Sequence, residues 1–144
     1  RNGWTGYPGI LVFGASLGAT HAANLYFRYP DLFDRLLALS GIYTAEYGFG
    51  TFMNNKVYEN SPVHYLANMP GDHPYIARYN QNKAVICVRQ GAWEIPDTTR
   101  QMDAICKGKG INVWFDYWGY DCAHDWDWWY KQVPYLIPWL LDQR

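Results

Sequence analysis

Ser16 is the side chain of this sequence that could act as a nucleophile. It lies at the centre of residues 14–18, GASLG, which match the pattern G-x-S-x-G. In that pattern the serine occupies a tight turn between a strand and a helix, and the amide of the next residue, here Leu17, can face an oxyanion. A serine hydroxyl is a poor nucleophile at neutral pH, so it needs a base and a third group that orients the base. The turn alone leaves a purely structural role open.

His124 is the best-placed base. It follows an apolar run that predicts a strand, residues 111–118, in the loop GYDCAHDW. Of the other histidines, His21 falls in the segment after the serine turn, while His64 and His73 lie in a long stretch rich in loop-forming residues. In hydrolases with this serine turn, the acid and then the histidine come later in the chain, each after a strand. The position of His124 satisfies that order.

Two acidic residues compete for the third position. Glu94 lies three residues beyond another predicted strand, residues 83–91. Asp97 follows Pro96, so it could equally cap the next helix or stabilise its first turn. We therefore favour Glu94 as the acid and keep Asp97 as the alternative.

Alternating strand and helix patterns position these candidates. Short apolar runs predict four buried strands, at residues 10–15, 34–43, 83–91 and 111–118. Helical spacing predicts helices at 17–29, 96–110 and in the closing segment 125–144, where we expect a break or kink near Pro134 and Pro138. This alternation indicates one α/β domain over residues 1–144, with a parallel sheet of about four strands and flanking helices.

Residues 44–82 predict a cover over the substrate site. They are rich in Gly, Asn, Pro and Tyr and give only short helical signals, such as SPVHYLANM with Ser61 as a cap and Pro62 at the first helical position. A segment this long inside a compact domain usually covers a functional site. We therefore expect residues 44–82 to shape the pocket.

Aromatic residues are the conspicuous bias in composition. The chain holds 8 Trp, 13 Tyr and 6 Phe, which together make 19% of it. Such side chains can pack a core, form an interface or line a wall for sugar and aryl ligands. The Trp residues after His124 have helical spacing, which indicates packing more than ligand contact. For the substrate pocket we expect Tyr43, Trp93 and Trp126.

Charge and cysteine content disfavour several classes of protein. The 12 basic and 13 acidic side chains are scattered and give a net charge of −1, so no basic stripe predicts nucleic-acid or membrane binding. Cys87, Cys106 and Cys122 form no CxxC pair, which suits reduced thiols and indicates neither a disulfide scaffold nor a metal site. No apolar run reaches the roughly 20 residues that span a bilayer, and no signal-peptide core is present. We expect a cytoplasmic protein without metal or cofactor.

Four segments together resemble the putative-esterase (esterase D-like) family of α/β-hydrolases: residues 14–43, NSPVHYL, RQGAWE-PDT and HDWDWWYKQVPYLIPWLL. Relatives in that family include feruloyl and acetylxylan esterases, S-formylglutathione hydrolases and mycolyltransferases. The resemblance spans nearly the whole chain and matches the C-terminal half of the fold. It implies Ser16 as nucleophile, His124 as base and an acid in the loop that holds Glu94. It also implies a carboxylic-ester substrate, an acyl-enzyme intermediate and no metal.

The chain departs from that family in what precedes the serine turn. Family members carry several further strands there, and a loop after an early one supplies the second oxyanion N–H group. Here residues 1–9 precede the first predicted strand, so the chain would be either a fragment of a longer protein or a half-size hydrolase. The first strand would then expose an open edge. We expect a second copy, forming a homo-oligomer, or a missing N-terminal segment to cover it.

Two classes of function stay open. The first is a serine esterase in which Ser16 attacks the ester, His124 transfers the proton, Glu94 holds the imidazolium and Leu17 N–H binds the oxyanion. An acyltransferase of the same family would use the same residues. The second is a non-catalytic, aromatic-rich binding or assembly domain derived from a hydrolase, because the loss of one oxyanion donor lowers the rate by about a hundredfold or more.

Overall fold

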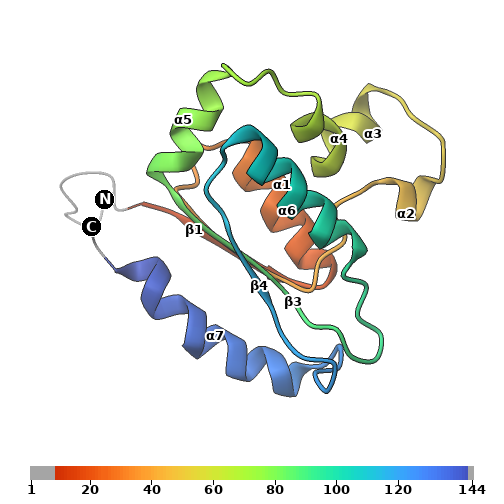
Figure 1. The fold of residues 1–144 in the computed structure, drawn as a ribbon, viewed down its shortest axis with the longest axis vertical. Coiled ribbons are helices and arrows are strands. Elements are labelled where there is room, and N and C mark those ends of the chain that lie inside the picture. Colours follow the sequence, from red (N-terminus) through yellow and green to blue (C-terminus); the bar gives the residue numbers. More distant parts are fainter. Residues whose placement is uncertain (1–8, 143–144) are drawn as a thin grey trace, which may run out of the picture.

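Four parallel strands form the centre of the molecule (Figure 1). The computed structural model describes residues 9–142. Its strands are β1 (Leu11–Ala15), β2 (Arg35–Leu39), β3 (Lys83–Val88) and β4 (Trp114–Tyr117), which lie side by side in the order β1-β2-β3-β4. Each strand pairs in parallel with the next. The α/β class is therefore confirmed, although each strand is shorter than the apolar run that predicted it.

Helices cover both faces of this sheet (Figure 1). One face packs against α1 (Leu17–Arg28), α4 (Pro62–Ala67), α5 (Pro74–Gln81) and α6 (Asp97–Lys109). The other face packs against α7 (Trp126–Leu141) alone among the helices of residues 9–142. Two short helices, α2 (Glu46–Phe49) and α3 (Asn55–Glu59), follow β2 and precede the packed helices α4 and α5.

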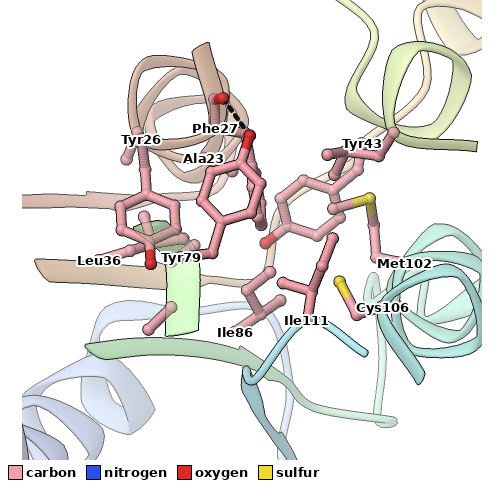
Figure 2. Packing of buried hydrophobic residues seen from close by; sticks show 14 of the residues in the cluster. Ala23, Tyr26, Phe27, Leu36, Tyr43, Tyr79, Ile86, Met102, Cys106 and Ile111 are labelled. Carbon is pink, nitrogen blue, oxygen red and sulfur yellow. Dashed lines mark hydrogen bonds between the residues drawn. The ribbon is translucent and has the colours of Figure 1, made fainter. Parts of the chain in front are cut away.

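Alternation along the central strands produces two separate cores. In β2, Leu36 and Ala38 face the α1 side, whereas Leu37 and Leu39 face α7, and all four are fully buried. Successive side chains of a strand point to opposite faces, so a continuous apolar run is what a sheet covered on both sides requires. Figure 2 shows the α1-side core, where the hydroxyl of Tyr79 donates a hydrogen bond to the carbonyl of Phe27.

The closing helix is not broken at its prolines, so the break that the sequence predicted as one of two possibilities is not observed. α7 is continuous through Pro134 and Pro138. Each proline removes one backbone donor from the helix. Both prolines are exposed, so the carbonyls they leave unpaired can bind water, while Leu136 and Leu140 keep the opposite side packed on the sheet.

The predicted cover divides into two parts with different roles. Residues 44–60, with α2 and α3, lie beside the serine turn and line a cavity there. Residues 61–82 instead belong to the core, where Leu66, Ile76 and Tyr79 are buried. The helix α5 was not predicted, because its polar residues and proline resembled a loop. The sequence therefore overestimated the length of the cover.

β1 is an edge strand within residues 9–142. Its Phe13 side chain remains 48% exposed, and Leu25, Tyr29 and Leu32 are further exposed apolar side chains in the segment that follows. Unpaired edges and exposed apolar patches are usually covered in native proteins.

None of the helices within residues 9–142 is long and apolar enough to cross a membrane.

Candidate active site

Ser16 occupies a sharp turn between β1 and α1. Its backbone has φ 57° and ψ −125°, a conformation that L-residues rarely adopt, and its N–H donates to the carbonyl of Leu39 at 2.8 Å. Gly14 is required here because a Cβ atom on it would overlap the backbone of Gly18. Gly18 itself has open space where its own side chain would be. The close approach of strand and helix thus depends on the first glycine of the pattern.

His124 lies within hydrogen-bonding distance of both predicted partners. Its Nε2 is 3.0 Å from Ser16 Oγ, and its Nδ1 is 3.1 Å from Glu94 Oε1. The backbone holds the histidine in place, since His124 N–H donates to the carbonyl of Ala92 at 2.9 Å. The three residues come from positions 16, 94 and 124, so the fold rather than the local sequence brings them together.

The loop after β3 carries the acid. Glu94 is almost completely buried, with 1% of its side chain exposed. The preceding residue, Trp93, has a positive φ of 66° and is 89% exposed. The N–H of Gly91 donates to the backbone carbonyl oxygen of Cys122 at 3.0 Å. A Cβ atom on Gly91 would lie only 2.5 Å from that oxygen. The loops that hold Glu94 and His124 are therefore in direct contact.

Asp97 has a different environment from Glu94. It is the first residue of α6, its side chain is 81% exposed, and it lies 3.7 Å from Arg100 one turn later. A carboxylate in the first turn of a helix stabilises the helix by interacting with its dipole. The two ring nitrogens of His124 contact Ser16 and Glu94, and the structure brings Asp97 to neither.

Two residues of the site, Ser40 and Arg89, were missed by the sequence analysis. Ser40 directly follows β2 with a positive φ of 59°, and its Oγ donates to Glu94 Oε1 at 2.8 Å. Arg89 follows β3, is 0% exposed, and its Nη2 lies 2.9 Å from the same oxygen. A charged residue directly after the fully apolar segment AVICV was the signal that could have identified Arg89.

A cavity of about 810 Å³ opens beside Ser16 and His124. One wall comes from residues 44–60 and carries Tyr47, Phe49 and Phe52. Trp93 lines the cavity as predicted. The described residues that line it include no carboxylate. The cavity is large enough for an ester with a bulky apolar or aromatic group.

The two other residues expected in the pocket do not line this cavity. Tyr43 is fully buried in the α1-side core, where burial raises the pKa of its phenol, because the chain turns inward after β2. Trp126 lies at the start of α7, is 63% exposed and packs against Trp129 and Tyr130. Both expectations are therefore corrected.

Leu17 begins α1 and lines the same cavity. The first N–H groups of a helix have no intrahelical partner, and the helix dipole adds a partial positive charge there. This arrangement can stabilise negative charge next to Ser16. Among residues 9–142, no group of three or more His, Cys, Asp or Glu side chains is arranged to hold a metal ion.

Comparisons with known proteins agree with this fold. A similar solved structure is a ferulic acid esterase, with a TM-score of 0.70 and 21% identity, covering 89% of this chain and 49% of that one. Another is an S-formylglutathione hydrolase from Staphylococcus aureus, with a TM-score of 0.66 and 19% identity, covering 92% and 51%. A third is the fluorophosphonate-binding serine hydrolase F of the same organism, with a TM-score of 0.69 and 18% identity, covering 92% and 54%.

These likenesses establish the fold, and the chain spans about half the length of each of the three proteins. No curated protein matches the chain. A family model described as "Putative esterase" matches residues 5–140. The chain therefore belongs to this esterase family of α/β-hydrolases.

Proposed function

We propose that this chain carries the catalytic residues of a serine hydrolase that cleaves carboxylic esters. The observation that supports it most is the continuous hydrogen-bonded series from Ser16 through His124 to Glu94 beside a cavity of about 810 Å³. Membership in an esterase family supports the same reaction class. Two of the similar structures bear the names ferulic acid esterase and S-formylglutathione hydrolase, which supports a hydrolase of the esterase type.

Each residue of the series has a distinct part in the proposed reaction. Ser16 Oγ attacks the ester carbonyl carbon while His124 Nε2 accepts the hydroxyl proton, and Glu94 stabilises the resulting imidazolium through Nδ1. The tetrahedral intermediate then expels the alcohol, which takes the proton from Nε2. Water repeats the sequence on the acyl-enzyme and releases the acid. An alcohol acceptor in place of water would make the same site an acyltransferase.

Oxyanion stabilisation in this proposal begins with the amide of Leu17. The amide heads α1 directly after Ser16, where a free N–H group of the first helical turn can stabilise the developing negative charge. A second donor is expected from a segment against β1, because that strand is an edge within residues 9–142. We propose that a second copy of the chain, or a further segment of the same protein, covers this edge.

A substrate screen tests the proposed function. We expect hydrolysis of at least one member of a panel containing short-chain nitrophenyl esters, feruloyl esters and acetylated sugars. Ser16→Ala and His124→Ala should each lower the rate by at least about a thousandfold, because serine and histidine act as one unit. His73→Ala is the matched control, since His73 caps α5 away from the cavity. Hydrolysis that persists in folded Ser16→Ala would contradict the proposal.

A further inference from the structure

Arg89 is a fully buried cation whose contacts all lie around the proposed catalytic acid. Its Nη2 lies 2.9 Å from Glu94 Oε1, and its Nε and Nη2 lie 3.3 and 3.2 Å from Ser40 Oγ. Its Nη1 donates to the carbonyl of Asp125 at 3.0 Å. A buried charge is tolerated only when it is paired and hydrogen-bonded, and here every guanidinium nitrogen has a partner.

Three donors meet at one carboxylate oxygen. Glu94 Oε1 contacts Ser40 Oγ at 2.8 Å, Arg89 Nη2 at 2.9 Å and His124 Nδ1 at 3.1 Å. Catalysis of the proposed type needs only the contact with histidine. The other two donors fix the position of the carboxylate and favour its ionised form, because hydrogen bonds and an opposite charge both stabilise that form.

Trp129 connects this pair to the histidine ring. The Arg89 guanidinium lies 4.8 Å from the centre of the Trp129 ring, and the His124 ring meets the same indole edge-on at 5.1 Å. The indole N–H points at Ser40 Oγ at 3.4 Å. Since Trp129 is 6% exposed and lies on α7, the helix covers the cluster, in which the side chains of Arg89 and Glu94 are almost completely buried.

The charged and titratable groups around the cluster are few. Asp125 Oδ1 lies 4.0 Å from Arg89 Nη1 and is the second carboxylate near the guanidinium. Cys87, Cys122 and Tyr43 also face the cluster, but burial raises the pKa of each, so they are neutral at neutral pH. Burial lowers the pKa of Arg89, and Glu94 and Asp125 oppose that change, so the guanidinium stays charged.

We propose, building on the esterase function above, that Arg89 and Ser40 are positioning residues for Glu94. They keep its carboxylate ionised, and they limit how strongly that carboxylate favours the protonated form of the His124 ring. Without Arg89, the buried carboxylate would lack its compensating charge. It would then hold a proton more strongly, either on itself or on the imidazole it contacts. In both cases a higher pH is needed before the Glu94–His124 pair loses that proton and Nε2 of His124 is free to accept the proton of Ser16. The pair therefore extends activity toward lower pH.

Titration of the His124 ring by NMR tests this inference independently of activity. The ring signals are assigned with His124→Gln, and the titration midpoint is compared in the wild type, Arg89→Met, Arg89→Lys and Ser40→Ala. We expect the Arg89→Met midpoint to rise by at least about one pH unit, and that of Ser40→Ala to rise less. Arg89→Lys keeps the charge, so its midpoint should stay close to that of the wild type. Arg100→Met is the control, because Arg100 is half exposed and pairs with Asp97.

The pH dependence of Ser16 labelling by a fluorophosphonate provides the second readout. In Arg89→Met, the midpoint of the low-pH side of the labelling-rate profile should shift to higher pH by the same amount as the NMR midpoint. A uniform loss of labelling at every pH, with an unmoved midpoint, would show a merely structural role and overturn the inference. If Arg89→Met does not fold, the midpoint of Ser40→Ala decides: a rise supports the inference, and an unmoved midpoint overturns it. Failure of the wild type to react would contradict the proposed function, while the NMR midpoints would still decide the role of Arg89.

Discussion

Three residues of the site have backbone conformations that L-amino acids rarely adopt. Ser16, Ser40 and Trp93 all have positive φ values. Such a conformation costs on the order of 1–3 kcal/mol per residue and persists only where the surrounding structure imposes it. Ser16 and Ser40 follow β1 and β2 directly, and Trp93 precedes Glu94. One of these conformations belongs to Ser16 itself, and the other two belong to residues that contact or directly precede Glu94.

The assignment of the acid predicts different effects for two conservative substitutions. Glu94→Gln should lower kcat/KM by about a thousandfold or more, because an amide cannot stabilise the imidazolium charge. Asp97→Asn should change kcat/KM less than about twofold, since Asp97 is exposed at the start of α6. Steady-state kinetics on any accepted ester, with circular dichroism as the folding check, measures both. The reverse ranking would contradict the assignment of Glu94.

The site could be predicted from the sequence where a residue type that takes part in catalysis follows the end of a predicted strand. Ser16, Glu94 and His124 each follow an apolar run, so their proximity could be predicted from the topology of a parallel sheet. The charge of Arg89 directly after AVICV marked it as unusual, but the partners of Ser40 and Arg89 could not be assigned, because a serine or arginine after a strand has no fixed partner until the neighbouring strands are placed. Tyr43 was misplaced since its spacing does not show whether the chain turns toward solvent or toward the core.

At the level of elements, the cover is held by a short chain of hydrogen bonds. Ser61 Oγ accepts from the N–H of Ala45 at 2.9 Å and lies 2.6 Å from His64 Nδ1. His64 Nε2 is 3.1 Å from Glu46 Oε1. Ser61 therefore does not cap α4 with its side chain, as its position suggested, but links α4 to α2. This link positions the aromatic wall of the cavity.

The aromatic wall should determine the size preference for substrates. Phe52 is 59% exposed and lines the cavity. Phe52→Ala should lower kcat/KM for an ester with a bulky aromatic group by about tenfold, because contact with the apolar ring is lost, and should leave a nitrophenyl acetate nearly unaffected. Tyr120→Ala is the control, since Tyr120 is exposed outside the cavity. Equal losses for both substrates would argue against a wall at Phe52.

The contact between α6 and β4 predicts a specific loss of stability at high pH. Burial, and then the hydrogen bond to Asp103 at 2.9 Å, raise the pKa of Tyr117 to about 12. Unfolded tyrosine has a pKa of about 10, so the folded state binds the proton more tightly and its stability falls between about pH 10 and 12. The stabilising contribution is fully present below that range.

Chemical denaturation at a series of pH values tests the contribution of Tyr117 to the free energy of unfolding. At pH 8, Tyr117→Phe should be less stable than the wild type by about 1 kcal/mol, because it lacks the hydrogen bond. The difference should shrink as the pH rises from about 10 to 12. Other tyrosines titrate equally in both proteins, so they do not affect the comparison. A difference that stays constant over this range would show that Tyr117 does not titrate as described.

At the scale of the whole molecule, the alternation of strands and helices was predictable, but the boundaries were not. The runs that predicted β2 and β3 extend past the strand ends, where Ser40, Gly41 and Arg89 are still buried although they lie outside the strands. The unbroken α7 shows that packing on the sheet outweighs two prolines when both lie on the exposed side.

The exposed edge predicts association of the isolated chain. Light scattering should give a mass above the 16.8 kDa monomer, because β1 and the Phe13 side chain are uncovered within residues 9–142. Phe13→Lys should reduce the mass, whereas Tyr130→Lys, a change on exposed α7 surface, should not. A well-folded, monodisperse monomer would contradict coverage of this edge by a second copy.

The central claim is that Ser16 is an activated nucleophile, and covalent labelling tests it most directly. Intact-mass spectrometry after treatment with a fluorophosphonate should show one adduct, and peptide mapping should place it on Ser16. Ser16→Ala should remain unlabelled, and His124→Ala should react far more slowly because the base is absent. Folded wild-type protein that forms no adduct, or an adduct that survives in Ser16→Ala, would contradict the claim.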